Sequence, residues 1–212
     1  DFDPGTGQQN RTAQGAADSF VLVLDPDFDF LWVNTYGSNG TVLETGSAVE
    51  FDSLGRVYVA GTFAGTVDFD PLVVQKDGVD VFTAAGTDDP FLLMLDQSGL
   101  FRWARQFGAA GDNFAEIADI LVTPANVHAY GSFQGAGFQN GSGITTLSSV
   151  GGSVDAFLTT FETTGFFLRA TQVGGTGHDR GQAIAGDRLG NLHLAGYFNE
   201  SVDFDPSALR MA

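Results

Sequence analysis

Three pairs of aspartates, with one residue between the members of each pair, are the best candidates for metal ligands in this sequence. They are Asp1 and Asp3, Asp68 and Asp70, and Asp203 and Asp205. On an extended strand this spacing places both carboxylates on one face, about 7 Å apart along the backbone. Hard oxygen ligands on flexible loops suit Ca²⁺. The alternative is a strand that directs the intervening Phe inward and the carboxylates into water, without a metal.

The three histidines do not predict a catalytic or zinc site. His128 and His193 fall at the repeat position that Tyr58 holds, which predicts an aromatic-like side chain on a strand face. His178 lies in a glycine-rich loop and is expected to be exposed to solvent. Zinc needs converging ligands at a defined spacing, and these residues lack such a spacing. A phosphate-binding loop is also rejected, because Gly-x-x-x-x-Gly-Lys-Ser/Thr does not occur and Lys76 is the only lysine.

The charge of the chain limits its partners. There are 26 acidic residues against 9 Lys and Arg, a formal net charge of −17. Nucleic-acid binding needs the opposite sign, since phosphate contacts dominate the affinity. Insertion into a membrane is not predicted either, because no long apolar run is present. We expect a solvated acidic surface, since turns alone recruit Asp and Gly; a set of Ca²⁺ sites is the alternative. There is no Cys, so disulfides and thiolate metal sites are excluded.

Internal repetition organises the whole sequence. Asp-x-Phe landmarks begin at Asp18, Asp89 and Asp155, which gives repeat lengths of 71 and 66 residues. Val-Asp-Phe-Asp-Pro occurs at 67–71 and 202–206, its last four letters open the chain, and a decayed copy lies at 135–140. Three landmarks at matching offsets make chance similarity an inadequate explanation.

Each repeat predicts four short antiparallel strands. In the second repeat they are expected at Gly46–Asp52, Arg56–Phe63, Pro90–Asp96 and Phe101–Phe107, joined in pairs by tight turns that end in Gly55 and Gly99. An insert of about 25 residues between the second and third strands predicts an additional hairpin. The fold class is therefore all-β, a β-propeller-like array of four-stranded antiparallel blades in about three repeats.

These landmarks resemble the bacterial β-propeller repeat family known as SBBP, in the variant with a Val-Asp-Phe-Asp-Pro insert. The matching elements are Asp-x-Phe, Gly-x-Phe-x-Trp, Asp-x-x-Gly-(Asn/Arg)-Val-Tyr and the insert itself, and they cover essentially all 212 residues. The resemblance implies a secreted or surface protein without assigned chemistry. Two departures stand out: the Asp pair is lost around Phe138, and Arg169 replaces the Trp of the other repeats (Trp32 and Trp103). The two tryptophans themselves predict packing between blades, with stacking on a sugar as the alternative.

The phase of the repeats predicts incomplete ends. We divide the chain into a half-blade at 1–37, blades at 38–108 and 109–174, and a half-blade at 175–212. An open array exposes unpaired strand edges. The segment is therefore expected to belong to a longer ring, to close a ring with a second copy by exchanging half-blades, or to join copies end to end.

The leading functional hypothesis is a non-catalytic extracellular or cell-surface module that mediates protein interaction or self-assembly. The alternative is an adhesin module, stabilised by Ca²⁺, that binds carbohydrate or protein. A glycoside-active propeller is the remote alternative, because such enzymes need paired carboxylates and the few Glu residues form no cluster with Arg. No cofactor is predicted other than the Ca²⁺ considered above, and targeting signals are expected to lie outside this segment.

Overall fold

The computed structural model describes residues 1–70, 80–108, 114–140 and 146–205. These residues form an all-β antiparallel structure with one short 3₁₀ turn at Val150–Gly152. The strands are β1 (Ser19–Leu24), β2 (Phe30–Tyr36), β3 (Thr45–Phe51), β4 (Val57–Phe63), β5 (Thr66–Asp68), β6 (Val81–Thr83), β7 (Asp89–Leu95), β8 (Phe101–Gly108), β9 (Ala115–Val122), β10 (Asn126–Gln134), β11 (Ala136–Asn140), β12 (Thr146–Ser148), β13 (Val154–Glu162), β14 (Phe167–Val173), β15 (Arg180–Gly186) and β16 (Leu192–Tyr197).

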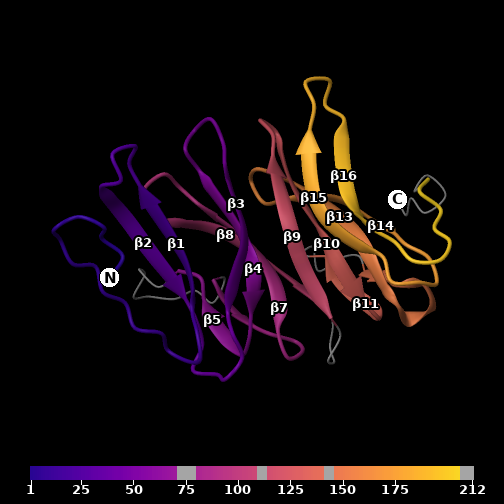
Figure 1. Cartoon of the computed structure of the whole chain (residues 1–212), viewed down its shortest axis with the longest axis horizontal. Coiled ribbons are helices and arrows are strands. Elements are labelled where there is room, and N and C mark those ends of the chain that lie inside the picture. The colour runs from indigo at the N-terminus through magenta and orange to yellow at the C-terminus, as the bar shows by residue number, and fades with distance from the viewer. Residues whose placement is uncertain (71–79, 109–113, 141–145, 206–212) are drawn as a thin grey trace.

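Within the described residues four sheets follow one another along the chain, and β5 and β6 form a small separate sheet. Sheet I is β1-β2, sheet II contains β3-β4-β7-β8, sheet III is β9-β10-β13-β14, and sheet IV is β15-β16. Figure 1 shows them side by side, with sheet I and sheet IV on opposite sides of the molecule. The four strands predicted for the second repeat are confirmed, with bounds that differ by one residue at most ends. Within the described residues the row of sheets stays open and closes no ring.

The insert forms a hairpin in both complete repeats, as its position predicted. In the second repeat β5 pairs with β6, and in the third β11 pairs with β12. The two hairpins are used differently, because β11 also pairs with β8 through Gln139 and Asn140 and so extends sheet II beyond its fourth strand. The decayed insert sequence therefore keeps its hairpin.

Aspartates hold the tight turns between strands. In the β3–β4 turn one oxygen of Asp52 accepts the backbone N–H groups of Leu54 and Arg56 at 2.9 and 3.0 Å. The turns that begin at Asp25, Asp96 and Asp187 repeat this pair of bonds from the second and fourth residues after the aspartate. Four of the chain's acidic residues are thus fixed by turn geometry.

A second kind of aspartate explains the Asp-x-Phe landmark. Asp18, Asp89 and Asp155 stand just before or at the start of the third strand of their repeats, and each accepts a backbone N–H from the loop four or five residues earlier. A Cβ atom at the glycine 19 residues later, Gly37, Gly108 or Gly174, would run into that carboxylate. The aspartate and the distant glycine therefore form one packing unit that ties each loop to its sheet.

The core consists of apolar layers between successive sheets. One layer joins Val21 and Tyr36 of sheet I to residues of sheet II such as Leu93, and a second joins Phe107 of sheet II to Phe157 of sheet III, with ring centroids 6.0 Å apart. A small third layer joins Tyr130 of sheet III to Ile184 of sheet IV. Burial of these side chains between sheets is the main source of stability for such an array.

Candidate functional site

The aspartate pairs share one hydrogen bond in all three copies. The first carboxylate of each pair accepts the backbone N–H of the second aspartate, at 3.0 Å for Asp1 and Asp68 and 2.9 Å for Asp203. In the second repeat Phe69 is buried while Asp68 and Asp70 are partly exposed. That geometry matches the arrangement with Phe inward and Asp outward.

None of the three pairs lies wholly on the extended strand that its spacing suggested, since β5 ends at Asp68, before Asp70. Asp1 and Asp3 precede β1, and Asp203 and Asp205 follow β16. Asp3 accepts the backbone N–H of Gly5 at 2.7 Å, so its carboxylate turns back onto its own loop. Asp205 is exposed, and its N–H is bound by Asp203. A short Asp side chain that binds the backbone two residues on competes with strand pairing, which explains the departure.

No group of three or more His, Asp or Glu side chains that could hold a metal occurs in the part of the chain that the structure describes. Asp1 and Asp3, Asp68 and Asp70, and Asp203 and Asp205 are thus not joined there by a third such ligand. Binding of Ca²⁺ by these pairs stays a prediction. The same described residues contain no helix long and apolar enough to cross a membrane.

The histidines lie where the repeat places them, in different environments. His128 is buried on β10, and its Nδ1 lies 2.9 Å from the hydroxyl of Thr160. Burial, together with the charge of Arg169, lowers the pKa of His128 to about 4, so the ring is neutral at physiological pH. His193 on β16 is exposed and contacts Asp187, and His178 is exposed in its loop.

Sheets I and IV each have a strand edge without a pairing partner among the described residues. In sheet II strand β4 pairs with both β3 and β7, and in sheet III β10 pairs with both β9 and β13. Among the described residues, the equivalent strand β16 pairs only with β15, and β1 pairs only with β2. Each end therefore presents half of a four-stranded sheet, with a row of backbone donors and acceptors available for another strand.

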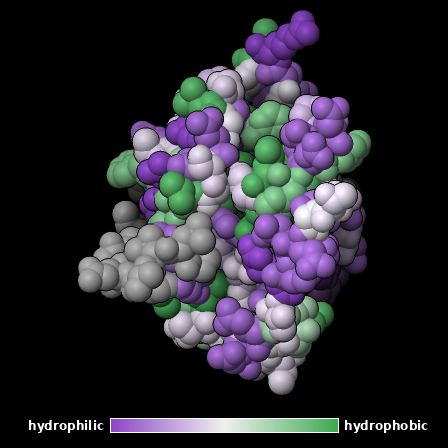
Figure 2. Space-filling model, turned by 90° about the vertical axis from the view of Figure 1, so that its left-hand side faces the viewer, coloured by the Kyte–Doolittle hydropathy of each residue, from purple (hydrophilic) through white to green (hydrophobic). Residues whose placement is uncertain are grey.

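Apolar side chains that the repeat normally buries are exposed at these ends. Phe20 of β1 is 54% exposed, whereas Phe91 at the same repeat position is 1% exposed. Phe198, which follows β16, is 53% exposed, whereas the equivalent Phe63 is 1% exposed. Figure 2, which views the sheet I end, shows hydrophobic residues interspersed with hydrophilic ones across that face. Both ends thus carry apolar area that a partner could cover.

Each end also carries half of one aromatic cluster. In sheet II, Phe69 lies against Phe63 at 5.5 Å and 86° and against Phe91 at 4.9 Å and 50°. At the sheet IV end, Phe198 and Phe204 repeat the first contact at 5.3 Å and 85°.

The second contact reappears at the sheet I end, between Phe2 and Phe20 at 5.0 Å and 56°. Sheet IV therefore lacks the equivalent of Phe91, which is Phe20, and sheet I lacks the equivalent of Phe63, which is Phe198. The two ends are complementary halves of the arrangement in sheet II.

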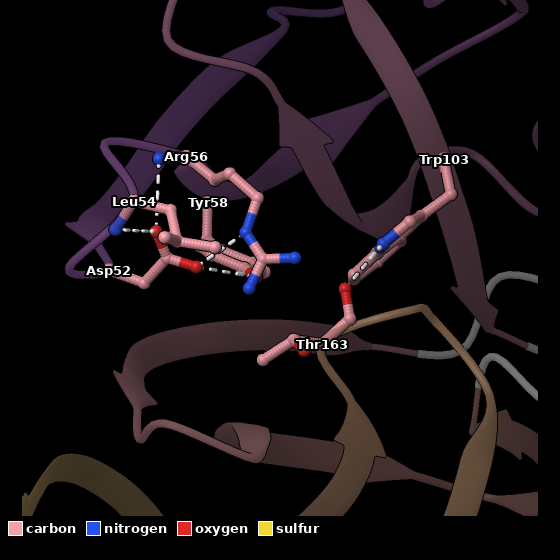
Figure 3. Close-up of polar contacts among 6 residues, drawn as sticks. All are labelled: Asp52, Leu54, Arg56, Tyr58, Trp103 and Thr163. Carbon is pink, nitrogen blue, oxygen red and sulfur yellow. Dashed lines mark hydrogen bonds and ion pairs between the residues drawn. The ribbon is translucent and has the colours of Figure 1, made fainter.

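Tryptophans connect one sheet to the next, as their shared repeat position predicted. The indole N–H of Trp103 on β8 donates to the carbonyl of Thr163 in the β13–β14 turn at 3.1 Å, beside Tyr58 and the Asp52 turn (Figure 3). Trp32 on β2 makes the same bond to Gln97 in the β7–β8 turn at 3.2 Å. In each junction the fourth strand of one sheet packs against the turn between the third and fourth strands of the next sheet.

One residue of the β1–β2 turn, which corresponds to the junction turns of the other sheets, was not singled out from the sequence. Phe28 occupies the position of Gly99 in the β1–β2 turn and has a positive φ of 67°, unusual for a side chain of this size. The signal was present in the sequence, since aligning the turns after Asp25 and Asp96 places Phe28 over Gly99.

The chain matches no protein-family model and no curated protein.

Proposed function

We propose that the chain is a non-catalytic structural module of a β-propeller array that acts outside the cell or at its surface and assembles through its open sheet edges. The repeated sheets support a propeller arrangement, since sheet I contacts sheet II and sheet II contacts sheet III through the same tryptophan junction. The extracellular setting rests on the sequence resemblance to SBBP repeats.

One observation carries the proposal: the two ends present complementary halves of a complete sheet. An unpaired β-edge lined with apolar residues is a template for another strand, and soluble proteins normally protect such edges with charges, bulges or short strands. Here β16 presents Leu194 at 39% exposure and β1 presents Phe20 at 54% exposure, and the described part of the chain covers neither edge.

The test is the solution mass by light scattering over a range of protein concentrations. The expected result is a mass above that of the single chain, rising with concentration. The variant Leu194→Asp places a charge on the β16 edge and is expected to lower the mass. The control Leu189→Asp adds the same charge in the β15–β16 turn, where the side chain is 88% exposed, and is expected to leave the mass unchanged. A single-chain mass at every concentration would overturn the proposal.

A further inference from the structure

We infer that the partner of the open ends is a second copy of this chain, and that Arg169 of one copy packs on the turn at Phe28 of the other. The inference deepens the proposed function and rests on it. It names the partner, the register of the new strand pair and the side chains that recognise each other.

The junctions inside the chain define what a neighbouring sheet must provide. Each tryptophan ring lies over a glycine of the next sheet's turn, Trp32 over Gly99 and Trp103 over Gly165. A Cβ atom at either glycine would lie 2.9 Å from the ring. A Trp on the fourth strand therefore requires a Gly in the turn it meets.

Two positions have no junction partner in the described chain: residue 169, on the fourth strand of sheet III, and residue 28, in the β1–β2 turn. Neither follows the Trp–Gly rule. Arg169 on β14 pairs with Thr160 as Trp103 pairs with Met94, so it holds the Trp position of sheet III. The N–H of Phe28 donates to the carbonyl of Asp25 at 3.0 Å, as that of Gly99 donates to Asp96 at 2.9 Å. Phe28 therefore holds the Gly position of sheet I. The fourth strand of sheet III thus has Arg in place of Trp, and the turn that it would meet in a joined array has Phe in place of Gly.

These two replacements fit each other. A Trp at position 169 would overlap the ring of Phe28, which is 72% exposed in the single chain. An Arg side chain is narrower at this point, and its planar guanidinium stacks on an aromatic face. The chain already uses this contact, since the guanidinium of Arg180 lies 4.3 Å from the ring centroid of Phe114.

Charge favours the same partner. Arg169 is exposed and forms no ion pair with any residue that the structure describes. Phe28 lies between Asp27 and Asp29, which are also exposed. The turn of sheet I thus combines an aromatic face with two carboxylates, the surroundings that an unpaired guanidinium binds best.

The strand register follows from the two complete sheets. Val59 pairs with Leu93 in sheet II and Ala129 with Thr159 in sheet III, which predicts Leu194 opposite Leu22 of the second copy. In the same register Gly196 lies opposite Phe20, as Gly61 lies opposite Phe91. Phe20 then reaches Phe198 and supplies the ring that the sheet IV end lacks.

Cross-linking tests the register, because the chain has no Cys of its own. A tagged Leu22→Cys chain is mixed with an untagged Leu194→Cys chain and oxidised, and heterodimers are measured on a non-reducing gel. The control replaces Leu194→Cys by Leu192→Cys, which lies two residues along β16. We expect at least tenfold more heterodimer from the first mixture. Equal or negligible yields from both, in protein that light scattering shows to be assembled, would overturn the inference and leave the proposed function standing.

Exchange of the junction residues tests the recognition. Arg169→Ala is expected to weaken association about tenfold, from loss of a desolvated cation–π contact, whereas the control Arg188→Ala, in the exposed β15–β16 turn, leaves it unchanged. Arg169→Trp is expected to weaken association further, and Arg169→Trp with Phe28→Gly to restore it by recreating the internal Trp–Gly junction. Melting temperatures verify that each variant folds. Folded Arg169→Trp that assembles as well as wild type, or a double variant no better than the single one, would overturn the inference.

Discussion

The substitution Asp155→Asn is expected to stabilise the protein at neutral pH and to weaken the fall in stability with rising pH. Asp155 is fully buried, and one of its carboxylate oxygens has no hydrogen-bond partner. The other accepts the backbone N–H of Val150 at 2.9 Å and, more distantly, the side-chain amide of Gln172 at 3.4 Å. Burial first, and then the nearby carboxylate of Asp179, raise the pKa of Asp155 from 3.8 to about 6.

The magnitude follows from linkage. Because the folded-state pKa is the higher one, the folded chain keeps the proton at pH values where the unfolded chain has lost it. The contribution to the free energy of unfolding is complete below about pH 4 and disappears as the pH rises through about 6. A shift of about two units corresponds to about 3 kcal/mol. Asn resembles the protonated acid and does not titrate. The free energy of unfolding of Asp155→Asn, relative to that of wild type, is therefore expected to rise by that amount between pH 4 and 7.

Urea unfolding at unit steps from pH 4 to 8 measures the difference between the two proteins, in which the other titrating groups cancel. Asp89→Asn is the matched control, because Asp89 holds the same repeat position but accepts the Gln106 amide at 2.5 Å, whereas the equivalent Gln172 amide lies 3.4 Å from Asp155. This control is expected to lose about 1–2 kcal/mol at pH 7. A difference between Asp155→Asn and wild type that is constant across the pH range would refute the reasoning.

Three further outcomes are expected. The pKa of His128 is lowered from 6.5 to about 4, which adds about 3 kcal/mol to the free energy of unfolding above pH 6.5; this contribution is lost as the pH falls to 4. In the same urea series His128→Gln is expected to abolish this pH-dependent loss, and a pH profile identical to that of wild type would contradict the prediction. Gly99→Ala costs at least about 1 kcal/mol more than Gly190→Ala, because both glycines have positive φ but only Gly99 lies under a tryptophan ring; equal losses in thermal unfolding would contradict the junction. Calcium held by Asp68 and Asp70 raises the melting temperature of wild type and leaves Asp68→Asn/Asp70→Asn unchanged, while the absence of any shift rejects the site.

The sequence predicted the strands because local rules and the repeat agreed with each other. The turn after Asp52 needs a residue at positive φ and receives Gly55 (φ 72°). The alternating Val57 and Val59 bury one face of β4, and the comparison of three copies removed the ambiguity of single segments. Strand bounds and the inserted hairpins were therefore predictable.

The candidate site was only partly predictable. The open edges followed from the phase of the repeats, but their recognition chemistry depends on which turn meets which strand across a sheet interface. Arg169 is one departure from a pattern and Phe28 is another, and only the observed contact of Trp103 with the turn at Thr163 shows that the two positions would meet. The unpartnered oxygen of Asp155 likewise arises from tertiary packing.

The matching aromatic contacts at the two ends have a consequence for the control of assembly. Phe2 and Phe204 both correspond to Phe69, so a joint sheet built from two copies holds two rings for a single place beside Phe20. Phe2 contacts Phe20 in the single chain, so in such a joint sheet it would compete with Phe204 of the second copy. If joining required one of the two rings to leave, the apparent affinity would fall in proportion to the fraction of copies in which it has left. In an array assembled as proposed, the segment of residues 1–4, which lies outside every strand, would then influence the concentration at which growth begins.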